Sequence, residues 1–396
     1  MLPMRSSALL DPKDAPVPAY GTRALCDLLP AVAAGFGLAS HHGPFIPSTG
    51  LRLEPADRVC VFLIDGLGLA QLRAHAAYAP FLASLLDSGQ ADGTRTLTAG
   101  FPSTTAASLA SFGTGLPPGR HGLVGYTVAV PGRNILMNQL RWEPWTEPTR
   151  WQPHPTVFGT LHARGIHTAQ VLPSRFATTA LTRVALSGGR FIPADDADAR
   201  MDRAAEETAA ADRTLVYTYL NDLDAAGHRE GVDSETWRDE LIRADRLAQR
   251  LANRLPPRSA LYITSDHGMI DIAPHQRIDY DHEWALRHGV ALLGGEARAR
   301  HVYTLPGATA DVHAAWKERL GETMWVATRD QAVEAGWFGP EAENRVLGRI
   351  GDIVAVAHAD IAVIATETEP GASAMPGLHG ALTDTELNVP LLHIRL

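Results

Sequence analysis

Acidic and imidazole side chains recur directly after the apolar runs of this 396-residue chain. Three such runs and one later loop (FLIDG, YLNDLDAAGH, ITSDHG and PGLHG) supply six of them: Asp65, Asp224, His228, Asp266, His267 and His379. So many carboxylates and imidazoles converging on one place would be costly unless cations neutralised them. Mixed Asp and His ligands suit zinc best, with manganese and iron as alternatives.

Each of these residues taken alone has an ordinary structural explanation. An Asp that follows a strand commonly caps the next helix, which would account for Asp65. Asp224 and His228 lie four positions apart, as in a surface ion pair on a helix or in a tight loop, and Asp222 competes for the same role. The adjacent Asp266 and His267 would fit a solvated turn. Only the complete set favours a metal centre.

A hydroxyl cluster supplies a candidate nucleophile. The segment FPSTTAASLASFGTGLPPGRHG (101–122) begins with Ser103, Thr104 and Thr105 and continues as a helix of small residues. These hydroxyls would serve as caps of that helix if they had no other role. A helix N-terminus also offers free N–H groups to a phosphoryl oxygen, and a nearby metal would turn a hydroxyl into a nucleophile. Both properties suit phosphoryl transfer.

The elements that must position these groups follow an alternating pattern. The apolar run VCVFLID (59–65) predicts a buried parallel strand, and similar runs occur at 168–172, 214–220, 260–266 and 352–358. A helical pattern covers 235–255 between two of them. This alternation predicts an α/β fold with a mostly parallel central sheet and helices on both faces. Ligands in such folds bind outside the carboxyl ends of the strands.

The region from 275 to 345 departs from this alternation. Strands at 301–304 and 324–328, with helices at 310–320 and 329–335, indicate a small α+β insert or cap. We therefore expect an N-terminal extension at 1–50, with one helix near 22–35. A catalytic α/β domain would comprise 51–274 and 346–396, and the insert 275–345.

Composition excludes several classes of function. A formal net charge of −9 argues against binding a nucleic-acid polymer, and no stretch approaches the ~18 apolar residues of a membrane span. Cys26 and Cys60 give neither a disulfide framework nor a zinc motif. The first residues lack a continuous apolar core, which favours the cytoplasm over secretion. The oligomeric state is not predicted.

The motifs LIDG, TTAASLASFGTGLPPGRHG, DLDAAGH, SDHGM and GLHG, in this order, resemble the alkaline phosphatase superfamily. The chain is most similar there to the nucleotide pyrophosphatase/phosphodiesterase family, over roughly 59–389. That family places its nucleophilic threonine nine residues before the threonine of a TG that is followed by HG. Here TG is Thr114–Gly115 and HG is His121–Gly122, so the resemblance selects Thr105 rather than Thr104.

The resemblance also implies a ligand set and a mechanism. One metal would be held by Asp65, Thr105, Asp266 and His267, and a second by Asp224, His228 and His379. Two such cations would activate the attacking oxygen and neutralise the leaving one. Thr105 would attack phosphorus and expel the leaving group, and water would then hydrolyse the phosphothreonine. The cofactors expected are two divalent ions, with zinc first.

One position departs from the family pattern. An asparagine that donates to a phosphate oxygen usually lies 21 residues after the nucleophile, where this chain has Tyr126. Its hydroxyl would donate similarly, or its ring would pack or stack on a substrate base. Asn134, Asn138 and Arg141 are further candidates for the missing donor.

The expected function is therefore hydrolysis of phosphodiester or nucleotide pyrophosphate bonds, with a small phosphate ester or nucleotide as substrate. A phosphomonoesterase on the same site is the alternative, and it would need extra cations, for which Arg133, Arg141 and Arg175 are candidates. A sulfatase is excluded because neither cysteine lies in a C/S-x-P-x-R context. A metal-bound binding module or an inactive relative is disfavoured because all seven matched positions retain ligand chemistry.

Overall fold

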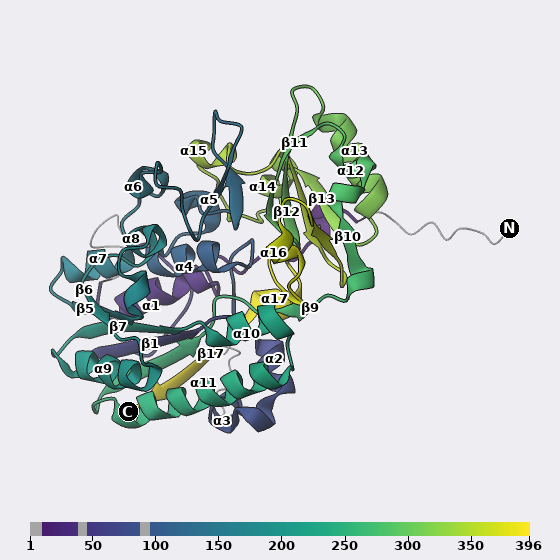
Figure 1. The fold of residues 1–396 in the computed structure, drawn as a ribbon. Helices are drawn as coiled ribbons and strands as arrows, with labels where there is room; N and C mark the ends of the chain where they lie inside the picture. Colours follow the sequence, from purple (N-terminus) through teal and green to yellow (C-terminus); the bar gives the residue numbers. More distant parts are fainter. Residues whose placement is uncertain (1–9, 39–45, 88–95) are drawn as a thin grey trace.

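The computed structural model describes residues 10–38, 46–87 and 96–396. Parts of the expected N-terminal extension, 1–9 and 39–45, lie outside these residues. The described chain forms a large α/β body and a smaller sheet with its own helices, which stands beside the upper end of that body (Figure 1). The helix expected near 22–35 is shorter, because a 3₁₀ turn (Leu25–Asp27) leads into α1 (Leu28–Gly35).

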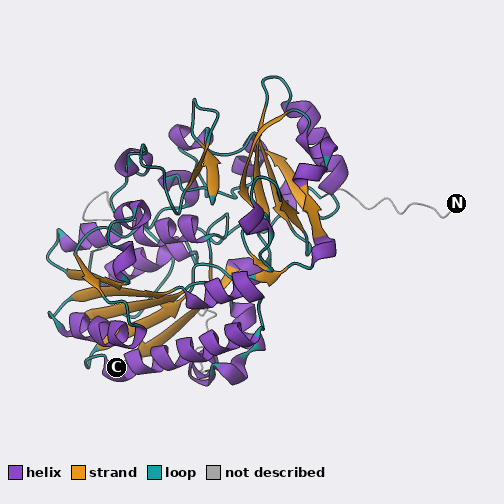
Figure 2. Ribbon diagram, in the orientation of Figure 1, coloured by secondary structure: helices purple, strands orange, loops and turns teal. Residues whose placement is uncertain are grey.

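A seven-stranded sheet forms the larger body (Figure 2). Five adjacent strands pair in parallel; β17 pairs antiparallel with β8, and β2 pairs antiparallel with β17 at the edge. This confirms the prediction of a mostly parallel α/β sheet. In spatial order the strands are β2 (Thr96–Thr98), β17 (Asn388–Arg395), β8 (Ser259–Thr264), β1 (Arg58–Ile64), β7 (Thr214–Leu220), β5 (His167–Leu172) and β6 (Arg190–Pro193).

The central strands are apolar throughout because helices cover both faces of the sheet. Alternate residues of β1 enter different cores: Val61 and Leu63 pack on one face, and Cys60 and Phe62 pack on the other. One face is covered by α9 (Ala197–Ala209) and α11 (Glu235–Arg254), and the opposite face by α1, α4 (Thr105–Thr114), α7 (Val157–His162) and α8 (Ala180–Ala185) (Figure 1). The predicted helix at 235–255 is confirmed.

The smaller unit, called the cap below, is a four-stranded antiparallel sheet in the order β11-β12-β14-β13. Its strands are β11 (Val290–Glu296), β12 (Ala299–Thr304), β13 (Met324–Thr328) and β14 (Ile353–Ala357). Its helices include α12 (Trp284–Arg287), α13 (Thr309–Leu320) and α14 (Arg329–Glu334).

The strand expected at 352–358 forms, but its assignment to the main sheet is wrong. It is β14, paired with β12 and β13 in the cap, so the cap sheet extends beyond the boundary expected at 345. The reason is that an apolar run of five residues buried on both faces looks the same in either sheet.

Buried polar contacts attach the cap to the catalytic body. The fully buried Arg298 forms an ion pair of 2.7 Å with Glu386, which is also fully buried. His301 on β12 donates from Nε2 to the carbonyl of Val124 at 2.8 Å, and its Nδ1 accepts from the Gly351 amide at 3.0 Å. These contacts fix the cap against α17 (Asp384–Leu387) and against the segment that follows α4. None of the helices in the described ranges is long and apolar enough to cross a membrane.

Candidate metal and phosphoryl-transfer site

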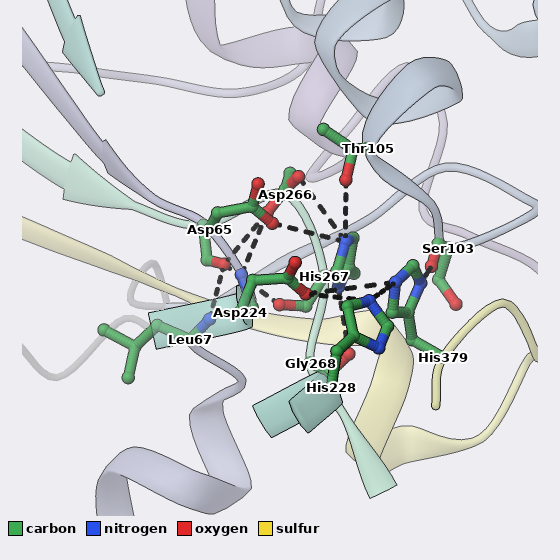
Figure 3. Close-up of polar contacts among 12 residues, drawn as sticks. Asp65, Leu67, Ser103, Thr105, Asp224, His228, Asp266, His267, Gly268 and His379 are labelled. Atoms are coloured by element: carbon green, nitrogen blue, oxygen red, sulfur yellow. Dashed lines mark hydrogen bonds and ion pairs between the residues drawn. The ribbon is translucent and has the colours of Figure 1, made fainter. Parts of the chain in front are cut away.

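The predicted acidic and imidazole residues meet at the carboxyl ends of three adjacent strands (Figure 3). Asp65 follows β1, Asp266 and His267 follow β8, and Asp224 lies in α10 (Asp222–Glu230), directly after β7. Gly66 has a positive φ of 74°, and a Cβ there would lie 3.0 Å from the Cβ of Asp224. The loop after β1 thus approaches α10 closely enough to bring these carboxylates together only because residue 66 is glycine.

The spacing of Asp224 and His228 is helical, since both lie on α10, one turn apart. His228 Nε2 is 3.5 Å from Asp224 Oδ1, and His379 Nε2 is 3.9 Å from the same oxygen. Asp222, the earlier competitor, is 40% exposed and lies 3.9 Å from Arg243 instead. The structure therefore brings Asp224, and not Asp222, to the histidines.

The hydroxyl cluster lies at the start of α4, as expected. Thr104 has extended backbone angles at the N-cap, and Thr105 is the first helical residue. The Thr105 hydroxyl lies 3.2 Å from His267 Nε2 (Figure 3). Ser103 instead donates to the carbonyl of Ala381.

The TG and HG motifs hold this helix in place. Gly115 ends α4 in the left-handed conformation, with a φ of 72°. His121 is fully buried and its Nε2 lies 3.0 Å from Ser111 Oγ on α4. The two motifs therefore influence Thr105 by fixing the position of α4, the helix that begins with it.

All three histidines turn their Nε2 atoms toward the centre of the cluster. The Nδ1 atom of His228 bonds to the Gly377 carbonyl at 2.8 Å, that of His379 to Ser103 at 2.8 Å, and that of His267 to Gly268 at 3.0 Å. Because a carbonyl oxygen only accepts, each Nδ1 carries the proton and each Nε2 presents a lone pair. Backbone partners of this kind typically orient metal-binding histidines.

Three buried carboxylate oxygens in the cluster have no hydrogen-bond partner among the described residues: Asp65 Oδ1, Asp224 Oδ1 and Asp266 Oδ2. Burial raises the pKa of Asp65, and the charges of Asp266 and Asp224 raise it further. Burial also raises the pKa of Asp224, although His228 and His267 oppose the shift. Burial lowers the pKa of His379, with further lowering from His267 and His228. In the absence of a cation, these shifts favour neutral carboxyl groups at Asp65 and Asp224 and a neutral imidazole at His379.

This donor set fits divalent metal ions. Ligand atoms of Asp224, His228 and His379 lie within 4.8 Å of one another, as do those of Asp65, Asp224 and His267. Asp266 Oδ2 and Asp65 Oδ1 are each 3.5 Å from His267 Nε2. A cation at each place would satisfy the unpartnered oxygens and the converging lone pairs, and nitrogen–oxygen sets of this kind suit zinc.

Two chambers adjoin at Thr105, and Thr105, Leu140 and Asp224 line both. The first, the apolar chamber, has a volume of about 250 Å³ and is walled mainly by Leu109, Leu172, Phe176, Leu181, Leu186 and Tyr217. The second, the cap chamber, has a volume of about 220 Å³ and is walled by Tyr126, Glu296, Glu369, Met375, Leu378 and His379 among others.

The candidate donors for a substrate phosphate fall in different places. Tyr126 lines the cap chamber, and its backbone amide donates to Glu296 Oε2 at 3.0 Å. Asn138 uses its side-chain oxygen for the amides of Leu140 and Arg141. Among the described residues, neither chamber is lined by Asn134 or Asn138 or by any arginine, Arg133, Arg141 and Arg175 included.

Two residues of the site were missed by reasoning from the sequence. Tyr219 on β7 donates its hydroxyl to Asp65 Oδ2. The available signal was its position as the second-last residue of a strand that leads to Asp224. Glu296 reaches the site from cap strand β11, where a Cβ on Gly380 would lie 2.5 Å from its Cγ. Burial raises the pKa of Glu296 to about 8. No motif in the sequence linked Glu296 to the other site residues.

Comparison with solved structures supports the same fold. Murine ectonucleotide pyrophosphatase/phosphodiesterase 5, solved as an inactive variant with AMP, is 18% identical and superposes with a TM-score of 0.66 over 85% of this chain and 87% of its own. Phosphonoacetate hydrolase from Sinorhizobium meliloti, with phosphonoformate bound, is 20% identical, with a TM-score of 0.61 over 86% of this chain and 91% of its own. No curated protein sequence matches the chain significantly.

The family profile described as type I phosphodiesterase / nucleotide pyrophosphatase matches residues 59–382. This span begins at the second residue of β1, ends three residues after His379, and contains every Asp and His residue of the candidate metal site. The earlier resemblance is thereby confirmed: the chain belongs to the type I phosphodiesterase / nucleotide pyrophosphatase family, whose members share the alkaline phosphatase fold.

Proposed function

We propose that this protein hydrolyses phosphodiester or nucleotide pyrophosphate bonds, with Thr105 as nucleophile. The observation that carries the proposal is the contact of 3.2 Å between the Thr105 hydroxyl and His267 Nε2, inside a cluster with three unpartnered carboxylate oxygens. Two divalent ions, with zinc first, would be held by Asp65, Thr105, Asp266 and His267 and by Asp224, His228 and His379. Such ions supply a lowered hydroxyl pKa and neutralise charge on the leaving oxygen.

The chain's own residues account for the remaining steps. The Thr105 oxygen attacks phosphorus, the bond to the leaving alcohol breaks, and that alcohol departs with a proton. Water then attacks the phosphothreonine ester, which restores the Thr105 hydroxyl and releases the phosphate product. The three Nδ1–carbonyl bonds keep the imidazoles oriented throughout, so little reorganisation is needed as charge develops.

The composition of the two chambers favours a diester over a monoester. A monoester carries nearly two negative charges at phosphorus, and no arginine or lysine lines either chamber in the described part of the chain. A diester carries one charge and has two arms, and two chambers meet at Thr105. In the place of the family's asparagine, the Tyr126 hydroxyl would donate to a phosphate oxygen from the wall of the cap chamber.

The test is a comparison of kcat/KM for an aryl methyl phosphate diester and the corresponding aryl phosphate monoester, with the zinc-loaded protein. We expect the diester to be the better substrate. Tyr126→Asn should preserve or raise diester activity, and Tyr126→Ala should lower it. Clearly faster monoester turnover would favour the phosphatase alternative and contradict the proposal. The expected location in the cytoplasm is likewise a proposal, which fractionation of the source cells would test.

A further inference from the structure

We propose that the apolar chamber beside Thr105 binds an apolar alkyl or aryl arm of the substrate, so that the preferred substrates are diesters of an apolar alcohol rather than nucleotides. This inference rests on the proposed phosphodiester hydrolysis and specifies its substrate class.

The walls of the apolar chamber come from four parts of the catalytic body. Leu109 lies on α4 one turn after Thr105, Leu172 ends β5, Leu181 lies on α8, and Tyr217 lies on β7. Leu172 and Tyr217 are almost fully buried, and Leu181 is 8% exposed. The volume of about 250 Å³ exceeds the ~150 Å³ of a cavity that holds benzene. The chamber therefore has room for a ring or a chain of several methylenes.

Several polar side chains in the wall of this chamber are already hydrogen-bonded. Thr179 Oγ1 donates to Thr182 Oγ1 at 2.8 Å. The side-chain oxygen of Asn221 accepts from Arg175 at 2.7 Å. The Thr179 hydroxyl and the Asn221 oxygen are thus already engaged rather than free to pair with the edge of a nucleobase.

Two tyrosines complete the wall from β7. The Tyr219 hydroxyl donates a hydrogen bond to Asp65, and the Phe176 ring packs edge-on against the Tyr219 ring with 5.9 Å between the ring centroids. The Tyr217 hydroxyl is buried without a partner among the described residues. A base in this chamber would leave several of its polar atoms buried and unpaired, at a cost that an apolar arm avoids.

The apolar chamber adjoins Thr105, so a group bound there can be an arm of the same substrate whose phosphorus Thr105 attacks. Thr105, Leu140 and Asp224 line both chambers, so a phosphorus atom in front of Thr105 would direct one arm into each. The cap chamber is lined by two carboxyl groups that the apolar chamber lacks, those of Glu296 and Glu369. The apolar arm therefore belongs in the chamber of leucines and aromatic rings.

The experiment is titration calorimetry of the zinc-loaded protein with methyl, butyl and hexyl phosphate and with adenosine 5′-monophosphate. We expect the dissociation constant to fall ~fourfold per added methylene until the chamber is full, as burial of CH₂ groups requires. The heat-capacity change of binding should become more negative along the series, which marks apolar burial. Hexyl phosphate should bind more tightly than the nucleotide.

Two variants on α8 sharpen the test. Leu181→Trp fills the chamber and should remove the dependence on chain length while methyl phosphate binds as before. Arg183→Trp places the same ring on the exposed side of the same helix and should leave the whole series unchanged. The wild-type series does not depend on how either variant folds.

A dissociation constant independent of chain length in the wild type would overturn the inference, as would tighter binding of the nucleotide. Failure of the proposed function would look different. In that case aryl diesters would not be hydrolysed, whereas the alkyl phosphates would still bind with affinities ordered by chain length.

Discussion

His228 and His379 direct their Nε2 atoms at each other across 3.2 Å, while each Nδ1 donates to a backbone carbonyl. Two imidazole lone pairs at this distance repel unless a cation or a proton lies with them. Asp224 Oδ1, unpartnered and within 3.9 Å of both nitrogens, adds negative charge at the same point. The geometry of this pair of histidines therefore fits the cation site proposed above.

The first prediction concerns metal content. Metal analysis of the purified protein should give two zinc-type ions per chain, and a chelator should abolish diester hydrolysis until Zn²⁺ or Mn²⁺ is returned. Asp224→Asn should lose at least one ion, because Asp224 belongs to both groups of converging ligand atoms. Asp222→Asn on the same helix, facing Arg243, is the matched control and should keep both ions. Full activity in chelator would refute a metal centre.

The second prediction separates the two neighbouring threonines. Thr105→Ala should lower kcat by at least ~10³-fold, because the covalent route is removed. Thr104→Ala removes a hydroxyl at the N-cap and should cost much less activity. Steady-state kinetics with an aryl diester would decide, and the reverse order of the two variants would place the nucleophile one residue earlier.

The third prediction concerns the hydrogen bond from Tyr219 to Asp65. Tyr219→Phe removes a donor that orients the carboxylate and should weaken metal binding ~10–100-fold, as loss of such partners typically does. Competition with a chromophoric chelator would measure the affinity. Tyr217→Phe removes a hydroxyl without a partner from the same strand face, so equal weakening in both variants would contradict a specific role for Tyr219.

The fourth prediction is a pH dependence of stability. Burial lowers the pKa of His301 to about 4, whereas an unfolded histidine titrates near ~6.5. The neutral form is thus favoured in the fold. The resulting contribution of His301 to the free energy of unfolding is about 3 kcal/mol. It is present above pH ~6.5 and is lost as the pH falls toward about 4.

Denaturant unfolding of the metal-free protein at pH 4 to 7 would measure this contribution. Replacement by a non-titrating group in His301→Gln should reduce the slope of the unfolding free energy against pH. His162→Gln changes an exposed histidine and serves as the control. An unchanged slope in His301→Gln would show that this histidine does not titrate on unfolding.

Much of the site could be predicted because its residues follow from local patterns. Asp65 and Asp266 end apolar runs that are typical of strands in a covered sheet, and the carboxyl ends of parallel strands meet at one edge. The choice of Thr105 over Thr104 came from the family resemblance, through the TG and HG motifs, and the structure shows a buried contact between His121 and Ser111 that holds the helix of Thr105. These are short-range signals, readable without knowledge of the tertiary structure.

The parts that could not be predicted depend on contacts between distant segments. The carbonyl partners of the histidines belong to two loops and to the short strand β16 (Gly377–Leu378), and a backbone oxygen is not distinguished by residue type. Glu296 reaches the site only because the cap folds back over Gly380. The apolar chamber combines leucines and aromatic residues from 109 to 217, each of which reads as ordinary core in the sequence. Which sheet contains β14 also could not be predicted, because it depends on pairing with the distant strand β12.

The central claim is that Thr105 becomes covalently bound to phosphorus during turnover, and one measurement tests it directly. The zinc-loaded protein is mixed with excess aryl methyl phosphate, quenched with acid during steady-state turnover and digested for mass spectrometry. The account predicts a methylphosphoryl group esterified to Thr105, absent when product methyl phosphate replaces the substrate and absent in Thr105→Ala. Sustained diester hydrolysis by Thr105→Ala at the wild-type rate, or a phosphoryl group found on another residue, would contradict it.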